Sequence, residues 1–115
     1  MRLPDGPIKP AVFYILLALA EQERHGYAIM QAVRERSGGQ VPLRTGSFYR
    51  HLAQLIAEGL VAETSGRPAD DDPRRGTYYR LTAAGDRVLT AERRRLSDLV
   101  AAIDSLRPAS RRGSA

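Results

Sequence analysis

Hydroxyl and guanidinium groups are concentrated in residues 44–52, which read Arg-Thr-Gly-Ser-Phe-Tyr-Arg-His-Leu. Apolar residues at helical spacing predict a helix from about Thr45 to Gly59, whose inner face comprises Phe48, Leu52, Leu55 and Ile56. The first turn of a helix presents free N–H groups and a positive dipole end, which suit a phosphate. Hydroxyls bond phosphates or base edges, and arginine matches a guanine edge. The segment predicts a DNA contact formed by Arg44, Thr45, Ser47, Tyr49, Arg50 and His51.

Two alternatives accompany this prediction. A Thr-Gly-Ser sequence at a helix start is also an ordinary cap, and His51 is either a phosphate contact or a solvated polar residue. The basic residues on both sides of the segment, and the β-hairpin that follows, favour DNA.

A second basic group follows between two short runs of β character, at 60–64 and 77–81. The intervening residues 65–76 are rich in glycine, proline and charge, which predicts a loop. A hairpin after a helix-turn-helix is a wing, and its arginines suit a minor groove or phosphates. We expect this wing to contact DNA through Arg67, Arg74, Arg75 and Arg80. The triplet Asp70–Asp72 favours a solvated turn instead, and no further ligand spacing supports a metal site there.

The last helix carries an apolar stripe. Thr82 is a candidate N-cap, Pro108 follows the helix, and the 25 residues from Thr82 to Leu106 would span about 37 Å at 1.5 Å per residue. Its three-four spacing is typical of a coiled-coil seam, which predicts dimerisation through Leu89, Leu96, Leu99, Ile103 and Leu106. Glu92 interrupts one row of the seam, and Arg93–Arg95 are expected on the solvated side. The alternative is that the stripe packs only on its own domain.

The remaining elements are those that must position these groups. Residues 1–7 are expected to fray, Pro10 suits a first helical turn, and 11–22 predict a buried helix. A second helix is expected over 27–37 after a break at Gly26, with His25 capping or ordering its start. Gly38 and Gly39 would close it. The predicted organisation is a winged helix-turn-helix domain at 8–82, a dimerisation helix at 83–106 and a disordered basic tail at 107–115.

Composition narrows the class of protein. The chain has 115 residues, a formal net charge of +5 and no cysteine. The charge favours a polyanionic partner, although an arginine-rich genome could also produce it. The absence of cysteine excludes disulfides and thiol catalysis. The longest apolar run, 11–20, is too short for a membrane span, and its flanks do not resemble a signal peptide. We therefore expect a cytoplasmic protein with no membrane partner.

Catalysis is not expected. The two histidines, His25 and His51, lack partners in any catalytic motif, and no phosphate-binding glycine loop occurs. The sequence predicts neither an enzyme nor a bound cofactor or metal.

Three ordered motifs resemble the PadR-like family of bacterial winged-helix regulators. His25-Gly26-Tyr27 resembles the family's opening "HGY". The run Gly46-Ser47-Phe48-Tyr49, continued by Leu52, Leu55 and Gly59-Leu60-Val61, resembles "GTLY…L…L…GLI". Residues 75–85 resemble the "YYRLT..G" passage from wing to helix. Together they cover roughly residues 16–89. Thr45 stands where a proline is common, and Ile56 stands where the family usually has glutamate, so the contact of that glutamate is absent or replaced.

The resemblance implies a homodimeric repressor of nearby promoters whose C-terminal helix mediates pairing. It also places Ser47, Tyr49 and the wing arginines at positions expected to meet DNA. Some relatives sense phenolic acids or hydrophobic drugs at the dimer interface. A small aromatic or hydrophobic effector is left open, because the chain has no tryptophan for stacking, and Phe13 and Tyr14 fit a core better than a pocket.

The combined prediction is a mainly α fold with a small β-hairpin, arranged as a winged helix-turn-helix plus a long C-terminal helix. The function expected of it is a sequence-specific, homodimeric repressor that binds a palindromic operator in double-stranded DNA. The alternative is a winged-helix adaptor that binds other proteins without specific DNA contact.

Overall fold

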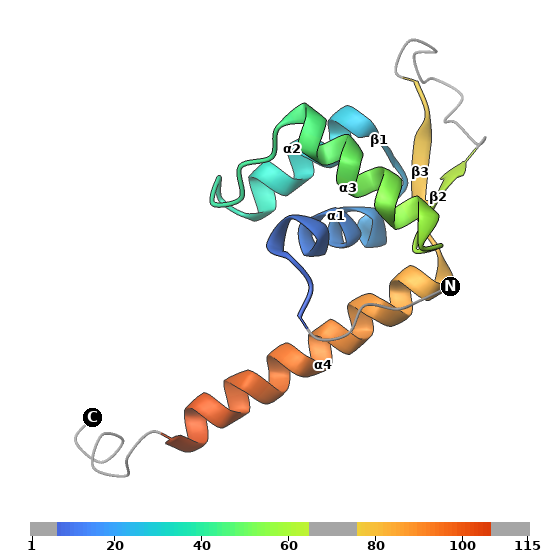
Figure 1. Ribbon diagram of the computed structural model, residues 1–115. Helices are drawn as coiled ribbons and strands as arrows, with labels where there is room; N and C mark the ends of the chain where they lie inside the picture. The colour runs from blue at the N-terminus through green and yellow to red at the C-terminus, as the bar shows by residue number, and fades with distance from the viewer. Residues whose placement is uncertain (1–6, 65–75, 107–115) are drawn as a thin grey trace.

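The computed structural model describes residues 7–64 and 76–106 (Figure 1). In these ranges the chain forms, in order, α1 (Pro10–Glu21), β1 (Arg24–His25), α2 (Gly26–Arg36), α3 (Thr45–Ala57), β2 (Val61–Thr64), β3 (Tyr78–Leu81) and α4 (Ala83–Leu106). The mainly helical fold with a small β-hairpin is confirmed. The predicted fraying start (except Pro7), the loop at 65–75 and the basic tail lie outside the described residues. So do Arg67, Arg74, Arg75 and Asp70–Asp72.

The core lies among α1, α2, α3 and the residues that follow α3. Each element contributes large side chains with almost no exposed surface, among them Ile15, Leu16, Ile29, Val33, Phe48, Leu52, Leu60 and Val61. Burial of an aliphatic or aromatic side chain of this size stabilises the fold by about 1.5–3 kcal/mol. In Figure 1, α1 lies between the α2–α3 pair and the first part of α4. Because Phe48 and Leu52 are buried in this core, the core fixes the position of α3.

The sheet has one strand more than the predicted hairpin. β3 pairs antiparallel with β2, where Val61 lies opposite Leu81, and on its other side with β1, where His25 lies opposite Tyr78. A strand of two polar residues shows no alternation, so the sequence did not predict β1. It holds the start of α2 against β3.

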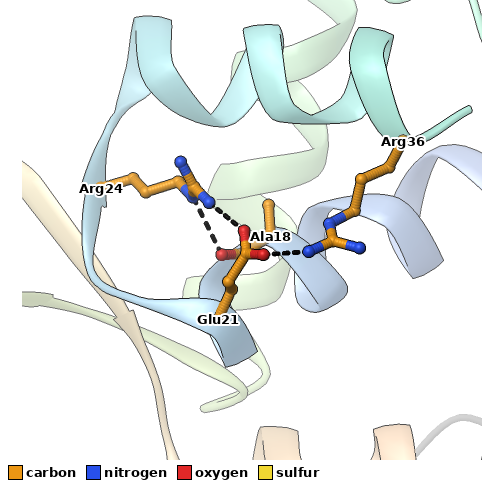
Figure 2. A network of polar contacts seen from close by, with 4 residues as sticks. All are labelled: Ala18, Glu21, Arg24 and Arg36. Carbon is orange, nitrogen blue, oxygen red and sulfur yellow. Dashed lines mark hydrogen bonds and ion pairs between the residues drawn. The ribbon is translucent and has the colours of Figure 1, made fainter.

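A polar network joins the end of α1 to the end of α2 (Figure 2). The Glu21 carboxylate forms ion pairs with both Arg24 and Arg36, one through each oxygen. Nε of Arg24 also donates a hydrogen bond to the carbonyl of Ala18 at 3.0 Å. These contacts fix the turn that carries β1.

The junction between α3, β3 and α4 depends on Thr82, whose predicted role as an N-cap is confirmed. Its Oγ1 accepts a hydrogen bond from the Gly85 N–H at 3.0 Å and donates one to the Gly59 carbonyl at 2.7 Å. Gly59 has a φ of 75°, a conformation that favours glycine. A single hydroxyl therefore caps α4 and ties it to the end of α3.

The two halves of α4 differ in their surroundings. Ala84 and Val88 are buried in the domain, whereas the second half extends away from the body (Figure 1). Glu92 is buried, and both its oxygens accept hydrogen bonds from Arg95, which holds the pKa of Glu92 below its usual value. Arg95, which was expected on the solvated side, keeps 33% of its side chain exposed while it pairs with this buried carboxylate.

Candidate nucleic-acid interface

The first turn of α3 is exposed and lacks a side-chain cap. Arg44 is the N-cap residue, and its side chain makes no capping hydrogen bond. Arg44, Thr45 and Gly46 are exposed, whereas Phe48, which follows in the same helix, is fully buried. The N–H groups of this turn and the positive end of the helix dipole therefore remain accessible to an anion.

Arg50 is placed over the same turn by a neighbouring hydroxyl. Its Nη2 donates a hydrogen bond to Oγ of Ser47 at 3.2 Å. Both side chains lie on the outward face of α3, opposite the buried Leu52. The contact holds a guanidinium, with other donors free, beside the exposed N-terminus of the helix.

Tyr49 lies against the start of α2. Its ring contacts Phe48 edge-on, with centroids 4.8 Å apart, and 47% of the residue remains exposed. A Cβ on Gly26 would stand 2.6 Å from Oη of Tyr49. Tyr79 of β3 lies near the Tyr49 ring. Burial raises the pKa of Tyr79, and the nearby Tyr49 and Glu63 raise it further. Gly26 therefore provides the space in which Tyr49 sits.

Replacing Gly26 with alanine is expected to weaken DNA binding while the domain remains folded. The new methyl group must displace the Tyr49 ring, since 2.6 Å is too short for a contact between a methyl carbon and a hydroxyl oxygen. A helix favours alanine over glycine by about 0.5–1 kcal/mol, and this gain offsets part of the strain. Operator titration and urea unfolding of the same variant separate the two effects. Unchanged affinity in the folded variant would show that the position of Tyr49 does not matter to DNA.

The other predicted contacts are less closely grouped. His51 is half-buried at the border between the outward face of α3 and the core side. Burial lowers its pKa, and the charges of Lys9 and Arg50 lower it further. Arg80 is exposed on β3 opposite Ala62. The structure thus places Arg44, Thr45, Ser47, Tyr49 and Arg50 at the start of α3, with His51 next to Arg50 in the same helix and Arg80 on β3. The other three predicted wing contacts, Arg67, Arg74 and Arg75, lie outside the described residues.

One exposed aromatic residue was not predicted to lie near this surface. Tyr27, in the first turn of α2, is 66% exposed, and its Oη accepts a hydrogen bond from Nε2 of Gln31 at 3.1 Å. The sequence drew attention to Tyr27 as part of the His25-Gly26-Tyr27 motif. The signal that could have identified it is its place directly after Gly26, because the start of α2 adjoins Tyr49.

The predicted dimerisation residues follow one face of α4 from the core outward. Leu89 packs partly against the core, and exposure then rises along the helix in the order Leu96 (39%), Leu99 (46%), Ile103 (55%) and Leu106 (80%). These exposed apolar side chains form one stripe along the second half of α4. Phe13 of α1 lines an apolar groove with Leu89 and Leu96, whereas Tyr14 packs against the core as expected.

Ile56 is half-buried and packs against the core. It therefore supplies apolar contact at the position where the resemblance leads one to expect a glutamate.

Other kinds of site find no support in the described part of the chain. Residues 7–64 and 76–106 contain no group of three or more histidine, aspartate or glutamate side chains placed to hold a metal ion. In the same ranges no helix has the combined length and hydropathy of a bilayer-spanning segment.

Comparisons with known proteins agree with this arrangement. A curated relative, the uncharacterized 37.1 kDa protein in transposon TN4556 of Streptomyces fradiae, is 39% identical over 82 residues, which cover 71% of this chain. The chain spans only about a fifth (21%) of the length of that relative.

Solved structures share the fold. A PadR family transcription regulator from Clostridium difficile superposes with a TM-score of 0.69 at 21% identity, covering 84% of this chain and 97% of that one. A transcriptional regulator from Clostridium thermocellum gives 0.66 at 21% identity, with 85% and 90% covered. RosR of H. salinarum gives 0.57 at 27% identity, with 93% and 86% covered.

The family model of the transcriptional regulator PadR-like family matches residues 15–91, which run from the buried face of α1 into α4. This range contains the exposed turn of α3, the sheet and the Thr82 junction. The chain belongs to the PadR-like family of transcriptional regulators.

Proposed function

We propose that this chain is a homodimeric repressor that binds a palindromic operator through α3 and the hairpin. The observation that carries the proposal is the exposed turn of α3, where Arg44, Thr45, Ser47 and Arg50 surround an uncapped helix N-terminus. Arginine and hydroxyl donors at such a position suit both phosphates and the major-groove edge of guanine.

A dimer follows from the size of this surface and from α4. One exposed turn contacts few base pairs, so specificity needs a second copy, and two recognition helices about 34–36 Å apart meet successive major grooves. The exposed Leu99, Ile103 and Leu106 would be covered by the same residues of a partner. Two-fold symmetry of the protein then predicts two-fold symmetry of the operator.

Selection of bound sequences from random duplex DNA tests the proposal directly. The expected result is a symmetric site whose half-sites lie about one helical turn apart. Transcription in vitro from a promoter overlapping that site should fall when the protein is added. Weak, sequence-blind DNA binding together with capture of a specific protein partner would favour the adaptor alternative instead.

Replacing Arg44 and Arg50 together with alanine should weaken operator binding by at least about 30-fold, because charge-assisted hydrogen bonds contribute about 1–3 kcal/mol each and 1.4 kcal/mol corresponds to about tenfold in affinity. The dependence of log K on log salt should become shallower by about 1 for each phosphate that the variant no longer neutralises. Both residues are exposed, so the free energy of unfolding should change little. Fluorescence anisotropy at several salt concentrations measures both the affinity and its salt dependence.

The matched control removes two arginines from α4. Arg87 and Arg94 are exposed, lie seven residues apart and face away from the apolar stripe. Their double alanine variant has the same net charge as the α3 variant. If the two variants bound the operator equally weakly, general charge rather than the turn of α3 would explain the binding.

The prediction of a cytoplasmic location and that of a small effector stay predictions.

A further inference from the structure

A single carboxylate contacts residues at both ends of α2. Glu21, the last residue of α1, pairs through one oxygen with Arg24, two residues before α2, and through the other with Arg36, the last residue of α2 (Figure 2). Nε of Arg24 also donates to the Ala18 carbonyl, so this arginine stays against α1. One side chain therefore ties the whole of α2 to α1, in addition to the apolar core between the two helices.

The first end of α2 leads to Tyr49. Arg24 lies opposite Tyr79 in the sheet, and Tyr79 is near Tyr49. Gly26, two residues after Arg24, provides the space for the Tyr49 hydroxyl, which would lie only 2.6 Å from a Cβ at that position. Because Tyr49 packs directly on Gly26, a small shift of this end of α2 would change the position of the Tyr49 ring.

The second end of α2 leads to the exposed turn of α3. Ser37 directly follows Arg36 and is buried, and its Oγ accepts a hydrogen bond from the Val41 N–H at 3.2 Å. Three residues after Val41 comes Arg44, the N-cap residue of α3. The connection between the two helices is therefore fixed next to Arg36, and a shift of this end of α2 would also move Arg44.

The charges of the network depend on Glu21. The guanidinium groups of Arg24 and Arg36 converge on its carboxylate, and neither forms an ion pair with any other residue in the described ranges. Without the Glu21 charge, these two cations would repel each other at the junction of α1 and α2. The core between the helices would remain, and exposed ion pairs contribute little to stability, so the domain should stay folded.

We infer that Glu21 is a positioning residue for the DNA-binding surface, because it fixes both ends of α2 and, through α2, the places of Tyr49 and Arg44. Only the effect on the operator rests on the proposed function. The inference predicts a result opposite in sign to simple electrostatics. Glu21→Gln removes a negative charge from a chain of net charge +5, which by itself should strengthen DNA binding. Loss of positioning should weaken binding to the operator.

The matched control is Glu35→Gln, which makes the same change in charge. Glu35 is exposed on α2, lines the same surface pocket as Glu21, and forms no ion pair with a residue that the structure describes. Anisotropy titrations compare the selected operator with an unrelated duplex. Glu21→Gln should bind the operator about fivefold more weakly, the effect of one lost hydrogen bond, and the unrelated duplex at least as tightly as the parent protein does. Glu35→Gln should lose no affinity for either DNA.

The positions themselves are measured without DNA. In NMR spectra of the full-length protein, the Tyr49 ring signals and the Gly26 amide signal should shift in Glu21→Gln and stay in place in Glu35→Gln. The melting temperatures of both variants should remain within about 5 °C of that of the parent protein. A change in the ratio of operator affinity to affinity for unrelated DNA, at nearly constant stability, is not expected of a residue that serves stability alone.

A double-mutant cycle tests the route through the arginines. In the Arg24→Gln/Arg36→Gln background, Glu21→Gln should cause no further loss of operator affinity, because the carboxylate no longer has a partner. If Glu21→Gln fails to fold, Arg36→Gln removes half of the network at an exposed residue. Arg87→Gln, at an exposed residue of α4, is its charge-matched control and should retain more operator affinity.

The inference is overturned if Glu21→Gln binds the operator as tightly as Glu35→Gln does, or if the Tyr49 signals do not move. The Arg44→Ala/Arg50→Ala variant tests the proposed function separately. Weaker operator binding by that variant, with unchanged binding by Glu21→Gln, would reject the role of Glu21 alone. If selection from random DNA gave no preferred site, the proposed function would fail, and the Tyr49 signals would still decide whether Glu21 fixes α2.

Discussion

Replacing Gly85 with alanine is expected to lower the free energy of unfolding by about 3 kcal/mol, which corresponds to a melting temperature lower by roughly 15 °C. A Cβ at this position would stand 2.2 Å from the Leu60 carbonyl oxygen and 2.6 Å from Cδ1 of Leu81. The Leu60 oxygen cannot easily retreat, because it also accepts a hydrogen bond from the Thr82 N–H at 3.1 Å. The methyl group therefore forces α4 away from the end of α3.

Gly46→Ala is the matched control for Gly85→Ala. A Cβ on Gly46 has no neighbour within 4 Å, and its backbone φ is not positive. In a helix, alanine is favoured over glycine by roughly 0.5–1 kcal/mol, so this variant should be as stable as the parent protein or slightly more stable. Urea unfolding of both variants gives the comparison. Equal stabilities would show that the contact between Gly85 and Leu60 is not tight in solution.

The helices could be predicted from the sequence because each combines apolar periodicity with a recognisable end. The predicted helix at 83–106 and the observed α4 coincide, since Thr82 provides a cap and Pro108 follows. The second helix was expected at 27–37 and is found at Gly26–Arg36. The capping role expected of His25 is confirmed, as its Nδ1 accepts a hydrogen bond from the Ala28 N–H at 3.3 Å.

Features created by tertiary contact could not be predicted in the same way. Gly26 was interpreted as a break between helices, but its importance lies in the close approach of Tyr49, a residue 23 positions later. Glu92 was interpreted as an interruption of a seam, whereas it is buried and paired with Arg95. Both tertiary contacts escaped prediction for the same reason. A local pattern shows that a position is unusual but does not show which distant side chain occupies the space beside it.

The residues of the candidate site show the same difference between local spacing and tertiary contact. The inward and outward faces of α3 follow from spacing, so Phe48 and Leu52 were correctly assigned to the core. His51 lies at the border between the outward face and the core side of α3, and its burial there depends on where the residues before α1 lie. The spacing of apolar residues in the sequence does not indicate that position. The DNA contacts predicted for α3 and the wing stay predictions.

Replacing Leu99 and Ile103 together with glutamate is expected to convert a dimer into a monomer of 12.7 kDa and to reduce operator affinity at least about 100-fold. In the proposed dimer both side chains lie in an apolar seam, where an unpaired carboxylate is strongly disfavoured. In the isolated chain they are 46% and 55% exposed, so the fold itself should keep most of its stability. Light scattering gives the mass, and anisotropy gives the affinity.

The control for this prediction places the same two carboxylates elsewhere on α4. Ala91 and Ala101 are exposed and lie away from the apolar stripe, so Ala91→Glu/Ala101→Glu should remain dimeric and bind the operator. If the Leu99/Ile103 variant also remained dimeric, the apolar stripe would not be the interface. If it became monomeric but bound a full operator as tightly as the parent protein, each protomer would read DNA alone. The reduction in affinity therefore measures how much of the specificity comes from joining two weak surfaces rather than from the exposed turn of α3.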